Sequence, residues 1–366
     1  MSGPARIAVA RQGTARLVAV LRGRHVTDLH AEPIDRPSRV GEILLGRITG
    51  RDAASGGAFV ALGDGPAGFL PKGGGRPGET ALVQMVEDAR AEKGPVLTRD
   101  IALPGRMLVH VPASRGVAVS SSLSGEARAR WRAILPAGWI VRRRAESVGR
   151  ERVEAEAEAL SALWRAIRDA ADRAEAPARL RAAPGLVERV VEDNDPVEEI
   201  LCEEAAEARR LTAWAKEAAP DLAESIRLDT VDLDSALGEA LAPEVPLPGG
   251  GRLTIEPTRA LVAIDVDTGG AQDKAAVDRA AVDAVARHLR LRALGGLIVV
   301  DFVTDPPEAA GRGGEGSRVA DPVVDALIRA TAEDPSPVRV ARQRPFGLVA
   351  LTRRRQGPGL AEVLGA

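Results

Sequence analysis

The sequence predicts an α+β protein of several domains. Three observations support this class: a length of 366 residues, a block of short, regularly spaced strands in the first third, and a strand, a helix and a strand in succession in the last third. The length exceeds what one ordinary hydrophobic core requires and suffices for two or three modest cores. We therefore expect a small barrel, a helical region and a C-terminal α/β domain.

The chain begins with a small β element. From Arg6 to Leu29, the segments IAVA, ARLVAVLRG and VTDLH alternate apolar and polar residues around glycine turns. The block from Gly41 to Ile101 then contains several short strands separated by Gly, Asp and Pro turns. This spacing is typical of a small barrel.

Helices dominate between Gly125 and about Ala174, where apolar residues recur at helical spacing around the basic stretch WIVRRRAES. The tetrapeptide APAR, which starts at Ala176, breaks this pattern. The chain resumes with LVERVVED, an acidic helix from Pro196 and the alternating run IRLDTVDLD. We place a domain boundary near Ala176.

The last third predicts a parallel βαβ unit. The run LPGGGRLTIEPTRALVAIDVDTGG is a hairpin that feeds a strand, a helix covers about Asp273 to Leu294, and LGGLIVVDFV has the apolar character of a buried parallel strand. A crossover of this length makes the two strands parallel, so their carboxyl ends lie at the same edge of the sheet. Open α/β sheets bind their ligands at that edge.

Three carboxylates fall at this edge. Asp265 and Asp267 share a face of the first strand, and Asp301 ends the second strand. If the strands are neighbours, we expect the three side chains to converge and to require a cation, and hard oxygen ligands suit Mg²⁺ or Mn²⁺. Such an ion favours attack of water on phosphorus. The alternative is that each aspartate only caps the turn or helix that follows it.

Composition excludes several classes. No stretch approaches membrane-spanning length, and arginine and glycine interrupt the first residues where an apolar signal core would run. We therefore expect a cytoplasmic protein without a membrane partner. Cys202 is the only cysteine, so neither a disulfide-linked partner nor a cysteine-rich zinc site is expected. The four histidines have no metal-binding spacing: His25, His30, His110 and His288.

The formal net charge of −2 conceals regions of opposite sign. Residues 192–207 are rich in carboxylates, whereas arginines without an acid among them gather near the end: Arg339, Arg342, Arg344, Arg353, Arg354 and Arg355. Arginine binds phosphate as a bidentate fork, which suits a nucleic-acid partner. A genome that favours arginine codons explains the same excess.

The last third resembles the catalytic region of the ribonuclease E/G family, through LPGGGRLTIEPTRALVAIDVDTGG and ARHLRLRALGGLIVVDF. In that family two aspartates hold magnesium, and the resemblance places them at Asp265 and Asp301. A third position, usually asparagine, helps to orient the attack and corresponds to Asp267. The aspartate keeps an acceptor, loses the amide donor and adds charge.

The segments GEILLGRI, AFVALG and GFLP resemble the OB-fold RNA-binding domain of the same family. The family stacks bases on two phenylalanines, which correspond to Phe59 and Phe69, and uses a lysine that corresponds to Lys93. Stacking combined with cationic contacts is how OB folds hold single strands. Taken alone, Phe59 is better explained as a core residue, whereas Phe69 lies beside a turn, where exposure is expected.

LPGRMLVHVP and WIVRRRAES resemble the pocket in which the family senses a 5′-monophosphate. Gly105, Val109, Arg142 and Arg143 occupy the matching positions, and Arg143 replaces a threonine. A solvated basic turn is the alternative. Serines in VSSSLSGE and the proline at Pro345 stand where the family carries arginines, which counts against recognition of the RNA end.

Two further departures concern metals. The family usually continues into a CPxC zinc-link motif, which this chain lacks before Ala366, so we expect no structural zinc and no zinc-linked tetramer, and a homodimer remains open. Thr304 and Asp305 change the acidic residue that follows the second metal ligand in the family.

The resemblance implies a particular domain order. An RNase H-like scaffold is expected at 1–38 and 177–240, an inserted OB fold at 39–100, a helical 5′-sensor-like region at 101–176 and a catalytic α/β domain at 241–366.

The expected reaction is magnesium-dependent hydrolysis of internal phosphodiester bonds in single-stranded RNA, which leaves 5′-phosphate ends, in RNA processing or decay. One alternative is an RNA-binding protein of the same fold whose catalytic site has decayed. A phosphodiesterase for small nucleotides ranks last, because it leaves the barrel without a purpose.

Overall fold

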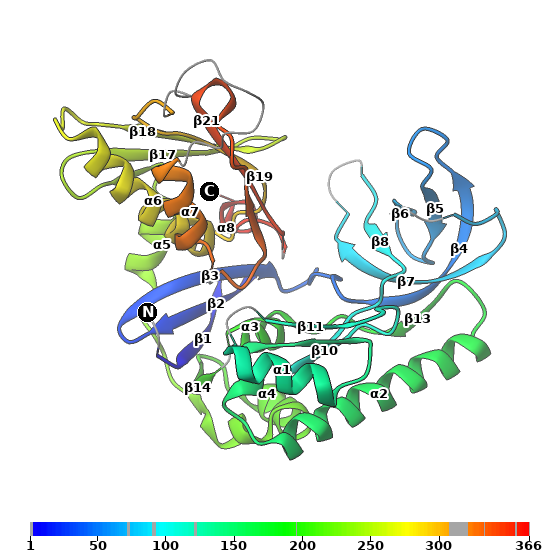
Figure 1. Cartoon of the computed structure of the whole chain (residues 1–366). Helices are drawn as coiled ribbons and strands as arrows, with labels where there is room; N and C mark the ends of the chain where they lie inside the picture. The colour runs from blue at the N-terminus through cyan, green and yellow to red at the C-terminus, as the bar shows by residue number, and fades with distance from the viewer. Residues whose placement is uncertain are drawn as a thin grey trace. The chain divides into compact units, whose positions relative to one another are not determined.

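The chain forms two compact units in the computed structural model (Figure 1). One unit comprises residues 1–36 and 197–366, and the other comprises residues 37–196. The structure describes residues 3–365 except 72–73, 90–92, 121–122, 195, 307–320, 333 and 356. Within that part of the chain, no helix is both long and apolar enough to cross a membrane.

The first unit opens with a five-stranded sheet in the order β15-β14-β1-β2-β3. In this sheet β1, β2 and β3 are antiparallel neighbours. On the other side of β1, β14 pairs parallel with β1, and β15 pairs parallel with β14. The predicted β element is confirmed as β1 (Ala5–Gln12), β2 (Ala15–Arg22) and β3 (His25–Pro33). Far along the chain follow β14 (Val197–Cys202) and β15 (Ile226–Leu228). The helix expected from Pro196 is wrong at its start, because Val197–Cys202 pairs with β1 as a strand. The helical elements of this segment are α4 (Ala205–Ala218), the 3-10 helix Pro220–Ser225 and α5 (Asp234–Leu241).

The second unit contains a closed five-stranded barrel. β4 pairs with both β5 and β7, so the strands close in the order β4-β5-β6-β8-β7. The strands are β4 (Ile43–Arg51), β5 (Ala58–Ala61), β6 (Gly68–Leu70), β7 (Thr80–Glu87) and β8 (Val96–Thr98). Closure buries Leu44, Val60 and Val83 in the barrel interior. The predicted small barrel is confirmed, and its strand order is consistent with an OB fold.

The rest of the second unit is a four-stranded sheet, ordered β11-β12-β10-β9, with helices. Its strands are β9 (Leu103–Pro104), β10 (Leu108–His110), β11 (Val117–Val119) and β12 (Trp139–Val141). The helices are α1 (Gly125–Ile134), the 3-10 helix Arg143–Glu146, α2 (Arg150–Arg173) and α3 (Leu186–Asp193). Trp131 is fully buried in their shared core.

One short strand bears on the domain boundary expected near Ala176. β13 (Ala178–Arg181) pairs antiparallel with β4, so it extends the barrel sheet. The segment 177–196, including α3, therefore packs with the second unit, and the first unit resumes at Val197.

The last segment of the first unit is a six-stranded sheet in the order β16-β17-β18-β19-β21-β20. The strands are β16 (Glu244–Pro246), β17 (Arg252–Pro257), β18 (Val262–Asp267), β19 (Gly296–Asp301), β20 (Val338–Val340) and β21 (Leu348–Arg353). The helical elements are α6 (Lys274–Leu291), α7 (Pro322–Ala330), the 3-10 helix Pro345–Gly347 and α8 (Leu360–Leu364). The predicted βαβ unit is confirmed: α6 connects β18 to its parallel neighbour β19.

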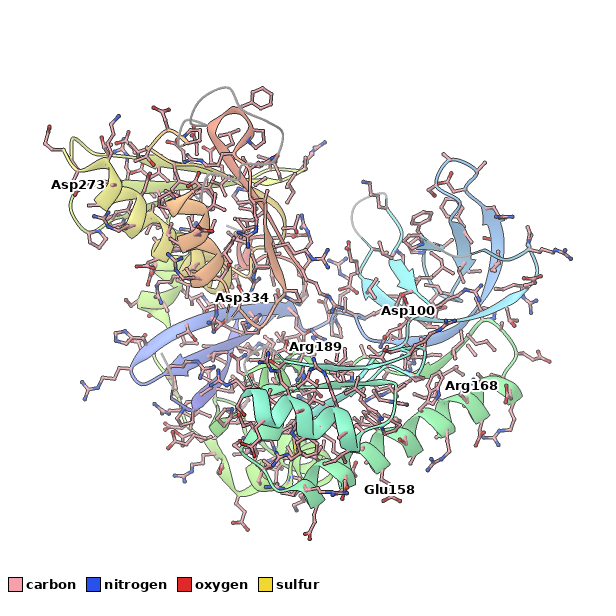
Figure 2. All side chains as sticks on the ribbon, in the orientation of Figure 1. Asp100, Glu158, Arg168, Arg189, Asp273 and Asp334 are labelled. Carbon is pink, nitrogen blue, oxygen red and sulfur yellow. The ribbon has the colours of Figure 1, made fainter. Side chains whose placement is uncertain are left out.

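The helix α6 begins where the sequence predicted it. The side chain of Asp273, labelled in Figure 2, caps it by accepting a hydrogen bond from the backbone N–H of Ala276 at 2.9 Å. Its apolar stripe packs on one face of the sheet, against Ile264, Val300 and Val349 among others. The buried core thus lies on the helix side, and the opposite sheet face carries Asp265 and Asp301.

Candidate active site and RNA-contact surfaces

Asp265 and Asp301 are direct neighbours across two parallel strands. The register pairs Asp265 on β18 with Asp301 on β19, at the carboxyl ends of both strands. Adjacent strands lie about 4.8 Å apart, so the two carboxylates project side by side. Their alternation with buried Ile264 and Val300 directs both onto the face that α6 and α7 do not cover.

Both carboxylates are exposed and have no hydrogen-bond or ion-pair partner among the described residues. Two adjacent acidic groups without a counter-charge repel each other, and a bound cation removes that repulsion. No group of three or more His, Cys, Asp or Glu side chains in the described part of the chain is arranged to hold a metal. The register thus shows Asp265 and Asp301 as a pair, and a cluster that includes Asp267 stays a prediction.

Asp267 is engaged elsewhere, although it shares the face of Asp265. Its side chain accepts a hydrogen bond from the backbone N–H of Gly269 at 2.6 Å. It also lies 3.7 Å from a guanidinium nitrogen of Arg252, its register partner on β17. Asp267 thus holds the turn after β18 and keeps an arginine next to the carboxylate pair.

Asp278 is a buried residue of the site that the sequence analysis missed. It is 1% exposed and lies on the core side of α6. Its carboxylate accepts hydrogen bonds from the backbone N–H groups of Val303 and Thr304, at 2.9 and 3.0 Å, and from the Thr304 hydroxyl. It therefore fixes the chain directly after Asp301. The available signal was a charged residue in the apolar phase of the helix, between Val277 and Ala281.

Two of the six arginines near the end of the chain support the fold rather than a ligand. Arg353 is 3% exposed and pairs bidentately with Asp334, at 2.8 and 2.9 Å, while it donates to the carbonyl of Leu294. Arg344 is buried and donates to the carbonyls of Gly347 and Thr304. The expectation that all six neutralise phosphates is therefore wrong. The guanidinium groups of Arg344 and Arg353 already donate hydrogen bonds to backbone carbonyls, and Arg353 also pairs with Asp334.

The barrel presents an aromatic pair. Phe59 on β5 and Phe69 on β6 are register partners, and their ring centroids lie 5.7 Å apart. Phe59 is 42% exposed, so the simpler interpretation of it as a core residue is wrong, and Phe69 is half-buried. A Cβ at Gly57 would lie 2.7 Å from the Phe69 ring, so glycine is needed for the ring to lie there.

Lys93 lies three residues before β8. It directly precedes Gly94, where a Cβ would collide with the carbonyl of Ala67 just before β6. The adjacent β8 pairs with β6 at Phe69. The lysine is exposed, and the strand that follows it lies next to β6, which carries Phe69.

The four residues matched to a 5′-phosphate pocket lie around β10 and β12. Gly105 and Val109 flank the turn at the start of β10, and Arg142 follows β12. Arg142 donates to the carbonyls of Gly105 and Glu192 and to the Asp193 carboxylate, at 3.2, 2.7 and 3.0 Å. Arg143 starts a 3-10 helix and is exposed. The structure thus groups Gly105, Val109 and Arg142 and surrounds the arginine with acceptors of the chain itself.

Glu156 is a second residue that the sequence analysis did not single out. Its carboxylate accepts three backbone N–H bonds, from Arg106, Met107 and Leu108, at 2.9, 2.8 and 2.7 Å. A Cβ at Gly105 would lie 2.7 Å from this carboxylate. The backbone N–H groups of the turn before β10 therefore bind an anion, and this anion is the Glu156 carboxylate on α2.

The fold and the site define an α+β protein in which a closed OB-like barrel accompanies an α/β sheet with a carboxylate pair at its edge. The model of the ribonuclease E/G family matches residues 102–356. The chain belongs to the ribonuclease E/G family.

Individual relatives agree with this membership. Ribonuclease E of Nostoc sp. is 34% identical over 316 residues, which are 79% of this chain and 45% of the relative. Ribonuclease G of Escherichia coli K12 is 27% identical over 395 residues, 95% of this chain and 79% of the relative. A chloroplastic ribonuclease E/G-like protein of Arabidopsis thaliana is 31% identical over 320 residues, 78% of this chain and 31% of the relative. The chain spans about half the length of the cyanobacterial ribonuclease E relatives, with 45% and 54% coverage.

Proposed function

We propose that this chain is an endoribonuclease that hydrolyses internal phosphodiester bonds of single-stranded RNA in the cytoplasm, in RNA processing or decay, and leaves 5′-phosphate ends. The single observation that carries the proposal is that Asp265 and Asp301 are register partners at the carboxyl ends of two neighbouring parallel strands. Membership of the ribonuclease E/G family supports the same class of reaction.

The donor set of this pair fits Mg²⁺, with Mn²⁺ as an equivalent. Asp265 and Asp301 offer hard carboxylate oxygens, are exposed, and have no competing partner among the described residues. When bound, the ion supplies positive charge for the phosphate under attack and makes a water molecule more acidic.

The side chains around the pair perform the remaining work. Asp267 keeps Arg252 at the site, where the arginine side chain is 52% exposed and accessible to a phosphate oxygen. Asp278 holds the backbone after Asp301 and so keeps that carboxylate in register with Asp265. Asp265 and Asp301 are the proposed metal ligands, and Asp267 is the proposed third catalytic residue.

The barrel is the proposed strand-binding surface. Phe59 and Phe69 stack bases, and Lys93 contacts the backbone of the strand. Arg339 and Arg354 are exposed and neutralise further phosphates, so affinity falls as salt rises.

We retain Gly105, Val109, Arg142 and Arg143 as the proposed 5′-phosphate site. The Arg142 guanidinium already donates a hydrogen bond to the Asp193 carboxylate, so a 5′-phosphate that binds Arg142 has to displace that carboxylate. The structure thus favours cleavage that depends little on the 5′ end.

The proposed architecture has an RNase H-like scaffold in the first unit. The strand order β15-β14-β1-β2-β3, with three antiparallel strands followed by two parallel ones, supports this assignment. The OB fold, the 5′-sensor-like region and the catalytic α/β domain complete the proposed layout.

Cleavage of a 5′-labelled, AU-rich single-stranded RNA tests the function. The wild-type protein is expected to cut internally with Mg²⁺ and not with a chelator, and Asp265→Ala and Asp301→Ala are expected to bind RNA without cutting it. A matched control is Glu256→Ala, which removes an exposed carboxylate from the neighbouring strand β17. Intact RNA in every lane with a clear gel shift would contradict the enzyme and favour an RNA-binding protein with a decayed site.

A further inference from the structure

Phe346 is an exposed aromatic side chain that the proposed function has not used. It is 99% exposed, in a chain that has four phenylalanines and no tyrosine. It lies in the short 3-10 turn that leads into β21. A phenylalanine ring at this exposed position does not pack in the hydrophobic core, so it contributes no burial energy to the fold.

The backbone at Phe346 is also unfavourable for this residue type. Its φ of 59° and ψ of 24° lie in the left-handed region. Residues with a Cβ enter this region at a steric cost, and a bulky aromatic is a rare occupant. Glycine or asparagine at this position would relieve the cost, so stability of the fold does not account for phenylalanine.

The turn is held firmly in this unfavourable conformation. Buried Arg344 donates its Nε to the carbonyl of Gly347 at 3.0 Å, and the N–H of Gly347 donates back to the carbonyl of Arg344 at 3.1 Å. A second nitrogen of Arg344 donates to the carbonyl of Thr304 at 2.8 Å. Pro345 restricts φ just before the phenylalanine. The ring is therefore presented on a fixed support.

This support adjoins the carboxylate pair. β21 begins at Leu348, and the register pairs Leu348 with Asp301. Phe346 is two residues before Leu348, a separation of at most about 7 Å of chain. The bond from Arg344 to Thr304 joins the same two segments just beyond Asp301. The exposed ring and the proposed metal ligands thus share one edge of the sheet.

The surroundings favour a nucleotide base over a protein partner. Arg342 and Gln343, which precede the turn, are exposed and polar. Among the described residues of this sheet and its connections, the other large exposed apolar side chain is Leu297, near the opposite end of β19 and four residues before Asp301. A stable protein interface needs a contiguous patch of about 800 Å² on each partner, whereas one isolated ring suffices to stack a base.

We propose that Phe346 stacks on a base of single-stranded RNA adjacent to the phosphodiester bond at Asp265 and Asp301, and so positions that bond for cleavage. This role rests on the proposed endoribonuclease function. Because every base has a π face, the contact tolerates any sequence, and it sets the placement of the strand rather than the identity of the base.

The test compares Phe346→Ala, Phe346→Gly and Phe346→Trp with the wild-type protein, on an RNA with one mapped cleavage site. The alanine and glycine variants are expected to lower kcat/KM about tenfold, and tryptophan is expected to retain it. The glycine variant is also expected to unfold at a higher temperature, because it removes the strain at φ 59°. Lower activity combined with higher stability excludes a merely structural role.

A second measurement separates this proposal from the proposed function. RNA that carries 2-aminopurine at nucleotides around the cleavage site is titrated with wild-type and Phe346→Ala protein in chelator, where no cleavage occurs. Quenching at one position that is lost in the variant supports stacking, even if the wild-type protein proves inactive. Equal quenching and equal kcat/KM in both proteins would overturn the proposal. So would unchanged cleavage together with a loss of self-association in light scattering, since the ring would then contact a second copy of the chain.

Discussion

Asp265 and Asp301 occupy register-paired positions on the parallel strands β18 and β19, although 35 residues separate them along the chain. The crossover through α6 produces this relationship, because a right-handed βαβ unit brings the ends of its two strands to one sheet edge. Asp278 on the same helix then fastens the chain after Asp301. One supersecondary unit thus supplies both proposed ligands and the residue that keeps them aligned.

The proposed stacking of bases on Phe59 leads to a prediction about the affinity for single-stranded RNA. Phe59→Ala is expected to weaken binding of single-stranded RNA about tenfold, because a stacking platform is lost, while Phe59→Trp retains it. The unfolding temperature is expected to change little, since the Phe59 side chain is 42% exposed. Fluorescence anisotropy with a labelled oligonucleotide measures the affinity. An unchanged Kd for Phe59→Ala would remove the barrel from the proposed binding surface.

Asp278 is predicted to act through the metal site. Asp278→Ala leaves two backbone N–H groups without their acceptor, so the apparent affinity for Mg²⁺ in cleavage assays is expected to fall about tenfold, as for other residues that orient metal ligands. Asp278→Asn retains one acceptor oxygen and is expected to recover part of the loss. Asp283→Ala alters an exposed residue of the same helix and serves as the control. Equal Mg²⁺ dependence for Asp278→Ala and the control would contradict this role.

The buried pair of Arg353 and Asp334, the latter labelled in Figure 2, is predicted to be essential for stability. Asp334→Ala leaves a buried guanidinium group without its counter-charge, which is expected to cost about 3–5 kcal/mol. The exposed pair of Arg150 and Glu154 offers a comparison, and Glu154→Ala is expected to cost less than about 1 kcal/mol. Urea unfolding of both variants measures the difference. Similar costs at the two sites would show that burial of the pair matters little.

Glu192 makes stability depend on pH. Burial raises the pKa of its carboxyl to about 8, with the charges of Asp193 and Glu156 adding to the rise against Arg142 and Arg181. The folded state therefore holds a proton that the unfolded chain releases near the ordinary glutamate pKa of 4.5. The stabilisation present at low pH is lost as pH rises to about 8.

Glu192→Gln removes this titration. Its gain in unfolding temperature over the wild-type protein is expected to be small at pH 4.5 and to grow up to pH 8. Glu158→Gln, at the exposed position labelled in Figure 2, is expected to show no such growth. A constant difference between Glu192→Gln and the wild-type protein across this range would mean that the carboxyl titrates at its ordinary pKa.

The sequence predicted the elements with strong periodic signals. The βαβ unit followed from an apolar strand, a helix and a second apolar strand, and the proximity of Asp265 to Asp301 followed from that topology. β13 was not predicted, because four residues with a proline before them have no period to detect, and only its pairing with β4 defines it as a strand.

The site contacts that were missed depend on tertiary structure. Asp278 reaches backbone groups 25 and 26 residues away, and no local pattern encodes such a contact. Arg353 and Arg344 could not be distinguished from exposed arginines by residue type, since burial and the position of their acceptors decide their roles. The exposure of Phe59 was underestimated for the same reason. Whether a strand residue faces the barrel interior or the solvent depends on how the barrel closes.

The central claim is that Asp265 and Asp301 together bind a divalent cation, and Mn²⁺ titration followed by electron paramagnetic resonance tests it most directly. The wild-type protein is expected to remove one equivalent of Mn²⁺ from the free-ion signal, with competition by Mg²⁺. Asp265→Ala and Asp301→Ala are each expected to lose this binding, whereas Glu256→Ala retains it. Binding that survives in both aspartate variants, or that is absent from the wild-type protein, would contradict the account.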